Sequence, residues 1–214
     1  MVDIIIPVHN GYSFFKNCLE SVFRYTKLDH RIIIVNDKSR EYPLNEYLNN
    51  LKKSKIKNLI ILNNNRNLGF IKSVNKGMQF GKDNDIVLLN SDTVVTRNWL
   101  QKLKSCAYSS EIIATVTPLS NNAAYCSVPN FEINNEIPAG FTINSFASLI
   151  GEKSLKLYPE IPTGVGFCMY IKREALNSVG YFDERYFGKG YGEENDFCMR
   201  AKKAGYISVL DDST

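Results

Sequence analysis

Residues 85–93 read DIVLLNSDT, an apolar run followed at once by polar residues. The same arrangement occurs in DIIIPVHN at residues 3–10, in RIIIVND at residues 31–37 and in LIILNN at residues 59–64. Short, continuous apolar runs of this kind are typical of strands that are buried on both faces of a sheet. The sequence therefore predicts four interior strands, each ending in polar side chains.

Segments with helical spacing of apolar residues separate these strands. We expect helices at residues 14–25, 44–51 and 70–80. Strands that alternate with helices imply βαβ units and a parallel sheet with right-handed crossovers. We therefore expect a single α/β domain with a Rossmann-like, mostly parallel sheet and helices on both faces.

The pattern is weaker beyond residue 96. Residues 120–162 are rich in Asn, Ser and Pro, and we interpret them as long loops with one short helix at residues 145–152. We further expect helices at residues 97–103, 173–179 and 196–204, and strands at residues 165–171 and 206–210. Because no element closes the domain after that last strand, we expect it to continue past Thr214.

Composition excludes several classes of protein. The net charge is only +4 and is spread along the chain, so no basic stripe suited to nucleic acid is present. The basic run at residues 52–57 is interpreted as the solvated end of a helix, with peripheral contact to an anionic membrane surface as the alternative. No apolar run approaches the roughly 20 residues of a membrane span. Five cysteines without metal-ligand spacing indicate reduced thiols in a cytoplasmic protein.

Asp92 is the first candidate for chemistry. Ligands of open α/β sheets bind at the carboxyl ends of the strands, where Asp92 follows the strand at residues 85–89. A carboxylate there suits Mg²⁺ or Mn²⁺, which in turn bridges phosphate oxygens. The alternative is that Asp92 caps the following helix.

A second acidic group comprises Glu193, Glu194 and Asp196, beside glycines at the start of a helix. The helix dipole favours acids there by a few tenths to about 1 kcal/mol, which is one interpretation of the group. The other is that one of the three is a general base. Asp196 and Arg200 stand four residues apart and are expected to pair on the helix.

Taken together, these segments resemble the family 2 glycosyltransferases of the GT-A fold. The matching stretches are IIPVHN at residues 5–10, NDKS at 36–39, NLGFIKSVNKG at 67–77, LLNSDT at 88–93, GYFDE at 180–184 and YGEENDFCMRAKKAGY at 191–206. They occur in the family's order from near Val2 to the end of the chain. The resemblance implies a catalytic domain over residues 1–214, with a nucleotide-binding half at 1–95 and an acceptor-side half at 96–214.

The resemblance also implies roles for individual residues. Asp92 would hold the metal, and Glu194 would be the catalytic base, with Glu193 contacting the acceptor or bracing the loop. Thr163 and Gly164 would lie near the sugar and the acceptor. The expected nucleotide-binding residues are Pro7, Val8, Asn10, Asp37, Asn67, Gly69, Lys72, Asn90, Ser91 and Asp92.

Three positions depart from the family's pattern. Asn90 replaces the first acid of its D-x-D motif, Glu194 replaces the more usual Asp, and the family's downstream histidine would lie beyond Thr214. The processive Q-x-x-R-W pattern is also absent from the sequence.

The resemblance implies an inverting, metal-dependent hexosyl- or deoxyhexosyltransferase in surface polysaccharide synthesis. Its donor would be a UDP-, dTDP- or GDP-linked sugar, its acceptor a glycan or lipid-linked hydroxyl, and its location the cytoplasm or the inner face of the membrane. The alternatives are an inactive relative that binds nucleotide or glycan, and a nucleotidyltransferase. The latter lacks support because no Gly-rich loop with a basic residue follows the first strand.

Overall fold

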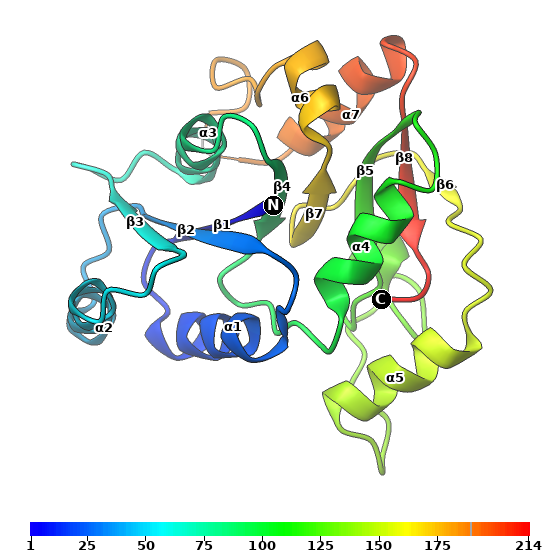
Figure 1. Cartoon of the computed structure of the whole chain (residues 1–214), viewed down its shortest axis with the longest axis horizontal. Helices are drawn as coiled ribbons and strands as arrows, with labels where there is room; N and C mark the ends of the chain where they lie inside the picture. Colours follow the sequence, from blue (N-terminus) through cyan, green and yellow to red (C-terminus); the bar gives the residue numbers. More distant parts are fainter. Residues whose placement is uncertain (189) are drawn as a thin grey trace.

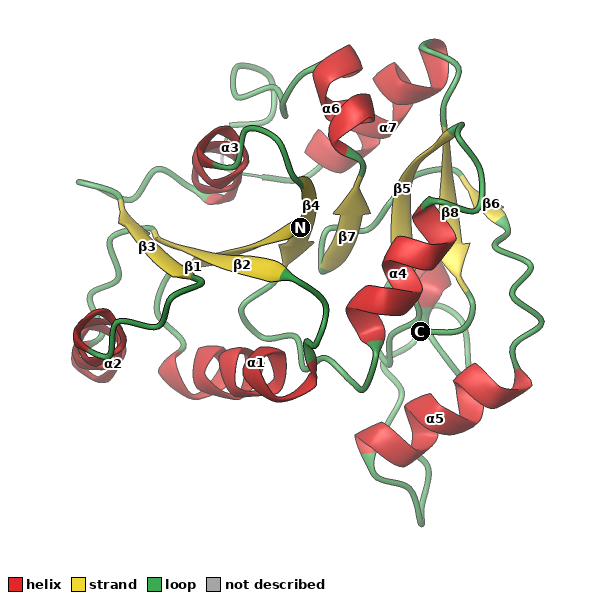
Figure 2. Ribbon diagram, viewed as in Figure 1, coloured by secondary structure: helices red, strands yellow, loops and turns green. Residues whose placement is uncertain are grey.

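The computed structural model describes residues 1–188 and 190–214, and in these residues eight strands form one sheet (Figures 1 and 2). The order across the sheet is β3-β2-β1-β4-β7-β5-β8-β6. The strands are β1 (Val2–Val8), β2 (His30–Asn36), β3 (Leu59–Asn63), β4 (Asp85–Leu89), β5 (Ile113–Pro118), β6 (Glu160–Ile161), β7 (Cys168–Ile171) and β8 (Ile207–Asp211).

Strand direction decides which loops meet at each edge of the sheet. β1 to β4 are mutually parallel, whereas β7 runs antiparallel to both of its neighbours, β4 and β5. β8 is parallel to β5, and β6 pairs with β8 in the antiparallel sense. Consequently the carboxyl ends of β1 to β5 and β8 lie at one edge, and the loop that leads into β7 joins them there.

Helices cover both faces of the sheet (Figure 2). One core packs side chains of α1, α2 and α4 against Ile4, Ile6 and Val8, while the other packs α3, α6 and α7 against Ile5. This alternation along β1 follows from the two-residue side-chain period of a strand. The helices are α1 (Tyr12–Tyr25), α2 (Tyr42–Lys53), α3 (Phe70–Phe80), α4 (Trp99–Ala107), α5 (Ile143–Lys153), α6 (Arg173–Val179) and α7 (Glu193–Lys203), with a short 3₁₀ turn η1 (Ala124–Cys126).

The expected α/β architecture is confirmed, with local differences, one of which is that α4 spans Trp99–Ala107 where a helix at residues 97–103 was expected. β5 and β6 were not expected from the sequence. β7 begins at Cys168, so residues 165–167 belong to a loop and not to the strand. α7 begins at Glu193, three residues before the expected helix at 196–204.

β5 escapes sequence analysis because its run is interrupted by polar residues. Thr115 and Thr117 alternate with apolar neighbours, yet all six residues of the strand are buried. The Thr115 hydroxyl donates to Ser208 Oγ at 2.8 Å, and the Thr117 hydroxyl accepts from the Val165 N–H at 3.1 Å. These hydrogen bonds offset the cost of burying hydroxyl groups.

Buried acids at the amino edge of the sheet have partners within the protein. Asp3 pairs with Arg31, whose Nη2 lies 2.7 Å from Asp3 Oδ2. Asp85 accepts hydrogen bonds from the hydroxyls of Tyr108 and Tyr170, each at 2.7 Å, and from the Arg173 N–H at 2.9 Å. Burial, together with the bond to Asp85, raises the pKa of Tyr108 to about 12. These two carboxylates are structural.

Within the described residues, each helix is too short or too polar to cross a lipid bilayer.

The motif glycine Gly77 yields the first prediction. A Cβ at this position of α3 would lie 2.6 Å from Ile5 Cγ2 in β1, so the helix can approach the sheet only because the side chain is absent. Alanine normally stabilises a helix relative to glycine by about 1 kcal/mol. At this site we expect Gly77→Ala to lower the free energy of unfolding by about 1–3 kcal/mol, because overpacking outweighs propensity.

Urea denaturation measures this effect. Asn49→Ala on the exposed side of α2 is the control and should change stability by less than about 0.5 kcal/mol. A stabilised Gly77→Ala protein would contradict the close approach of α3 to β1.

Candidate functional site

Asp37, directly after β2, organises the edge formed by β1, β2 and β3. Its side chain is buried, and Oδ1 accepts from the Asn64 side chain at 2.9 Å and from the Leu68 N–H at 2.7 Å. Oδ2 accepts from the Gly69 N–H at 2.8 Å. Asp37 therefore fixes the loop between β3 and α3. A carboxylate has about four acceptor positions, so it retains capacity for a ligand donor.

Gly69 is suited to this contact by its backbone. Its φ of +87° lies in the region that favours glycine, and it is the N-cap residue directly before α3. A side chain here would be strained by this backbone conformation. The expected nucleotide residues Asp37 and Gly69 are thus brought into direct contact.

The residues after β1 are joined to the same loops. The Asn10 side-chain oxygen accepts from the Arg40 N–H at 2.8 Å, and the Asn10 backbone N–H donates to Ser39 Oγ at 3.1 Å. His9 is exposed, and the Asn67 side-chain nitrogen lies 3.2 Å from its Nε2. Pro7 and Val8 are buried in the strand, so they form the floor of this region.

Lys72 lies in the first turn of α3, apart from the contacts that Asp37 makes with Leu68 and Gly69. It is half-buried and lines a depression with Lys76, one turn away, and with Arg66 and Glu184. Lys76 Nζ donates to the carbonyl oxygen of Asn63 at 2.7 Å. The structure therefore places Lys72 beside the β3–α3 loop, among other cations.

The polar residues after β4 meet the loop that leads into β7. The Asn90 N–H donates to the Phe167 carbonyl at 2.8 Å, and the Thr93 hydroxyl donates to the same carbonyl at 3.3 Å. Asn90 and Ser91 are half-buried, whereas Asp92 is exposed. Among the described residues, Asp92 takes part in no ion pair.

The alternative role of Asp92 as a helix cap does not fit. α4 begins at Trp99, and the residue at its N-cap is Asn98. Asp92 lies in a turn well before that point. Its carboxylate is accordingly free to meet a ligand.

Glu194 reaches the same loop from α7. Its Oε1 occupies the space beside Gly166, since a Cβ on Gly166 would lie 2.1 Å from that oxygen. One residue later, Phe167 binds Asn90. The loop at residues 163–167 therefore connects the segment that contains Asp92 to the Glu194 carboxylate.

The surroundings of Glu194 make it a stronger base. Burial raises the pKa of its carboxyl above the ordinary value of 4.5, and the negative charge of Glu193 raises it further. Hydrogen bonds from the backbone N–H groups of Glu194 and Gly166 act in the opposite direction. A carboxylate with a pKa moved toward neutrality is better suited to general base catalysis.

The other two acids of the cluster have different surroundings. Glu193 is 3% exposed, and its Oε2 has no hydrogen-bond partner within the described part of the chain. Asp196 pairs with Arg200 at 2.8 Å, as the sequence predicts. Arg200 also donates to the carbonyl oxygens of Val179 and Tyr181, so this pair fastens α7 to the end of α6.

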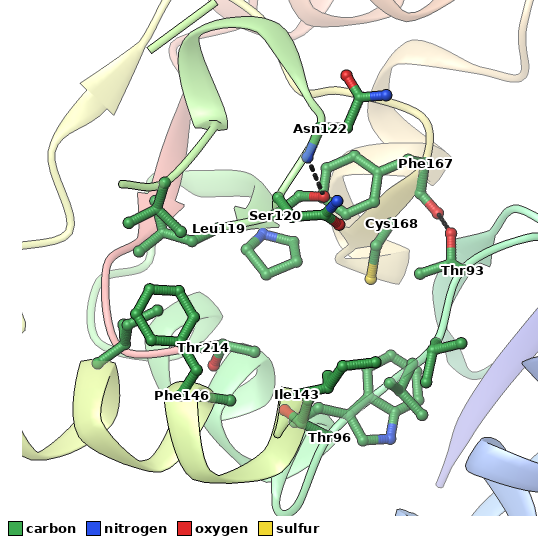
Figure 3. A pocket seen from close by; sticks show the side chains of 18 of the residues that line it. Thr93, Thr96, Leu119, Ser120, Asn122, Ile143, Phe146, Phe167, Cys168 and Thr214 are labelled. Atoms are coloured by element: carbon green, nitrogen blue, oxygen red, sulfur yellow. Dashed lines mark hydrogen bonds between the residues drawn. The ribbon is translucent and has the colours of Figure 1, made fainter. Parts of the chain in front are cut away.

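A cavity of about 540 Å³ opens beside Asp92 (Figure 3). Its volume lies within the roughly 300–1,000 Å³ of typical small-molecule sites. It passes Asn90 and Cys168 and continues between the end of β5 and helix α5, with Thr214 also on its wall. Asp92 thus stands where a ligand could reach both the sheet edge and this cavity.

The donor set at Asp92 fits a loosely held divalent cation. Within the described residues there is no cluster of three or more His, Cys, Asp or Glu side chains that could hold a metal alone. Mg²⁺ is usually bound through one or two carboxylates plus substrate phosphates and waters. One exposed carboxylate next to the Asn90 amide suits that arrangement.

Sequence analysis missed Gly166 and His9 as site residues. The TGVGF stretch at residues 163–167 contains two glycines directly before β7, and this spacing could have indicated a close approach of another group. His9 follows the buried strand β1, which is the position that the other site residues share.

Three comparisons with known proteins agree with this architecture. The model of the family described as glycosyl transferase family 2 matches residues 3–180. An uncharacterized glycosyltransferase of Haemophilus influenzae is 26% identical over 103 residues, which are 48% of this chain and 31% of the relative. The chain thus matches less than a third of that relative's length.

Solved structures show the same fold. GalNAc-T7 with UDP, GalNAc and Mn²⁺ has a TM-score of 0.77 at 17% identity, covering 100% of this chain and 42% of that one. TarS 1–349 of S. aureus has a TM-score of 0.68 at 16% identity, covering 100% and 58%. The mannosyltransferase PcManGT of Pyrobaculum calidifontis, with GDP-Man and Mn²⁺, has a TM-score of 0.66 at 12% identity, covering 99% and 56%.

The raised pKa of Glu194 leads to a stability prediction. When the folded-state pKa exceeds the unfolded one, the ionised carboxylate lowers stability above the unfolded pKa and has no effect well below it. We therefore expect Glu194→Gln to raise the Tm at pH 7, with a difference that shrinks as the pH falls toward 4.

Thermal unfolding at the two pH values tests this expectation. Glu46→Gln on exposed α2 is the matched control and should leave Tm unchanged at both. A lower Tm for Glu194→Gln at pH 7 would show that the carboxylate is instead held by stabilising partners.

Proposed function

The chain belongs to glycosyl transferase family 2, and we propose that it transfers a hexosyl or deoxyhexosyl group from a nucleoside diphosphate sugar to an acceptor hydroxyl with inversion. The observation that carries this proposal is the meeting of two segments across the loop at residues 163–167. Asp92 approaches from β4 and Glu194 from α7. A cation held by Asp92 suits the leaving nucleoside diphosphate, and the Glu194 carboxylate suits the attacking acceptor hydroxyl.

The donor nucleotide would bind over the ends of β1, β2 and β3. Asp37 would accept a hydrogen bond from the base or ribose while it holds Gly69 in place. His9 and Asn10 stand at the open side of the same region. TarS of S. aureus was solved with UDP-GlcNAc and PcManGT with GDP-Man, which supports a nucleotide-sugar donor; UDP-, dTDP- and GDP-linked sugars are all candidates.

Asp92 would hold Mg²⁺ or Mn²⁺ together with the diphosphate. When bound, the cation supplies positive charge that offsets the charge developing on the leaving nucleoside diphosphate. The GalNAc-T7 and PcManGT structures contain Mn²⁺, which supports this assignment. Asn90 and Ser91 would orient the same end of the donor.

Glu194 would act as the general base. It removes the proton from the acceptor hydroxyl, and the oxygen attacks the anomeric carbon as the bond from that carbon to the diphosphate oxygen breaks. The electron pair of the broken bond leaves with the nucleoside diphosphate, and the proton stays on the Glu194 carboxylate. A single displacement of this kind inverts the anomeric configuration.

Glu193 would contact the acceptor. Its buried Oε2 has no partner within residues 1–188 and 190–214, and an unpaired buried carboxylate oxygen is costly. An acceptor hydroxyl that donates to this oxygen would remove that cost. Asp196 is engaged with Arg200 and would serve structure alone.

The biological setting follows from weaker observations. All five cysteines are free and buried, which supports a reducing, cytoplasmic compartment. The acceptor would be a glycan or a lipid-linked sugar in surface polysaccharide synthesis. Contact with the inner face of the membrane would then run through a lipid-linked acceptor or the basic run at residues 52–57.

An inactive relative that binds nucleotide or glycan is the second candidate function. Asn90 favours it, because an amide carries no charge for a metal where the family's motif has an acid. No observation in the structure favours a nucleotidyltransferase. Release of nucleoside diphosphate separates the two remaining candidates.

The metal assignment is tested by that assay with UDP-, dTDP- and GDP-linked hexoses. We expect release with Mn²⁺ or Mg²⁺ and a fall of at least about 100-fold in excess chelator or in Asp92→Ala, because the metal contributes several kcal/mol. Tm should stay unchanged, since Asp92 is exposed. Asp83→Ala, an exposed acid at the amino edge, is the control.

Two results would contradict the metal assignment or the activity. Full release in chelator, or by the Asp92→Ala protein, would remove the metal from Asp92. Binding of a nucleotide without any release, with or without candidate acceptors, would support the inactive relative.

Gly166 tests the position of the base. A methyl group in Gly166→Ala would displace Glu194 Oε1, and a misplacement of about 1 Å costs roughly 100-fold in rate. We expect kcat to fall by about that factor while donor KM is retained. In a Glu194→Ala background, Gly166→Ala should have no further effect, since nothing then occupies the space. An equal loss in both backgrounds would mean that Gly166 acts through something other than Glu194.

A further inference from the structure

Helix α5 carries an apolar stripe that the protein core does not bury. Ile143, Phe146, Ala147 and Ile150 follow the i, i+3, i+4, i+7 spacing of one helix face. None of the residues of α5 is fully buried, although every other long helix has buried side chains in the part of the chain that the structure describes. Figure 1 shows α5 standing away from the sheet.

This stripe faces the cavity beside Asp92, which has two unlike walls. All four stripe residues line it (Figure 3 labels Ile143 and Phe146). The opposite wall is formed by the end of β5 and the segment after it, which supply the polar residues Ser120, Asn121 and Asn122 beside the apolar Pro118 and Leu119. The wall opposite the stripe therefore adds polar residues to apolar ones, whereas the stripe itself is apolar.

Charge is nearly absent from this cavity. Among the described residues that line it, Asp92 is the only charged side chain. No lysine, arginine or histidine is among the described lining residues, so these walls supply no cation to pair with an anion. The described walls therefore favour an uncharged occupant beyond the metal position.

The apolar surface continues outside the cavity. Val94 and Ile143 line the cavity and are also exposed, at 41% and 43%. Phe146 packs edge-to-face against the exposed Phe141, with ring centroids 5.7 Å apart. An apolar track thus runs from the neighbourhood of Asp92 along α5 to the surface.

We propose that this cavity binds the acceptor, and that the acceptor is a neutral sugar carrying an apolar aglycone such as a lipid chain. The reacting hydroxyl lies toward Phe167, which lines the cavity and directly follows the Gly166 that Glu194 Oε1 adjoins. The other sugar hydroxyls face the polar wall, and the aglycone lies along Ile143, Phe146 and Ile150. The proposal rests on the proposed function, because continuity with Asp92 is what makes the occupant an acceptor.

Paired glycosides test the proposal directly. The probes are the methyl and the octyl β-glycosides of glucose, galactose, mannose and N-acetylglucosamine, the octyl forms used below their micelle-forming concentration. Affinities are measured by calorimetry in the presence of UDP and Mn²⁺. For at least one sugar we expect the octyl form to bind at least about tenfold more tightly, which requires burial of only about two methylenes.

Variants of the stripe residues show which side chains cause the preference for the octyl glycoside. Phe146→Ser and Ile150→Ser should each lower the octyl-to-methyl preference toward unity while leaving the affinity for the methyl glycoside and for UDP unchanged. Leu155→Ser is the matched control, because Leu155 is 77% exposed and does not line the cavity. It should retain the full preference.

The outcomes separate this proposal from the proposed function. Equal affinity for the two forms of all four sugars, or a preference that survives both Phe146→Ser and Ile150→Ser, would overturn the apolar subsite. Absence of UDP binding, together with an octyl preference that the two variants abolish, would overturn the proposed function and support the subsite.

Discussion

The reversed direction of β7 is the constraint on which the rest of the site depends. Because β7 runs against β4 and β5, the loop that leads into it arrives at the edge where the parallel strands end. Its Phe167 carbonyl binds Asn90, and its Gly166 leaves room for the Glu194 carboxylate. Had β7 been parallel to its neighbours, this loop would lie at the amino edge and α7 would have no route to Asp92.

Asp92 and Glu193 at the carboxyl edge of the sheet have different surroundings from the two carboxylates at the amino edge. At the amino edge, Asp3 and Asp85 are buried with partners that satisfy them, so they stabilise the fold. At the carboxyl edge, and counting partners only among the described residues, Asp92 has no ion pair and the buried Glu193 Oε2 has no hydrogen bond. Asp92 and Glu193 thus lack interactions that a ligand is expected to supply.

Sequence reasoning recovered what depends on local pattern. Continuous apolar runs indicated β1 to β4, and the spacing of Asp196 and Arg200 indicated their pair. It missed β5, whose buried threonines are satisfied by residues distant in the chain. Likewise, nothing local to Asp37 shows that it holds the loop at residues 64–69, and the role of Gly166 requires knowledge of where α7 packs.

The central claim is that Glu194 is the base, and turnover of single-carboxyl variants tests it most directly. Glu194→Gln should bind donor normally, since the amide keeps its size, while kcat falls by about 10² to 10⁴. Asp196→Asn should retain turnover wherever its fold is intact, because Asp196 is engaged with Arg200. A near-normal kcat for Glu194→Gln, beside an inactive Glu193→Gln or Asp196→Asn enzyme, would contradict the account and move the base to that carboxylate.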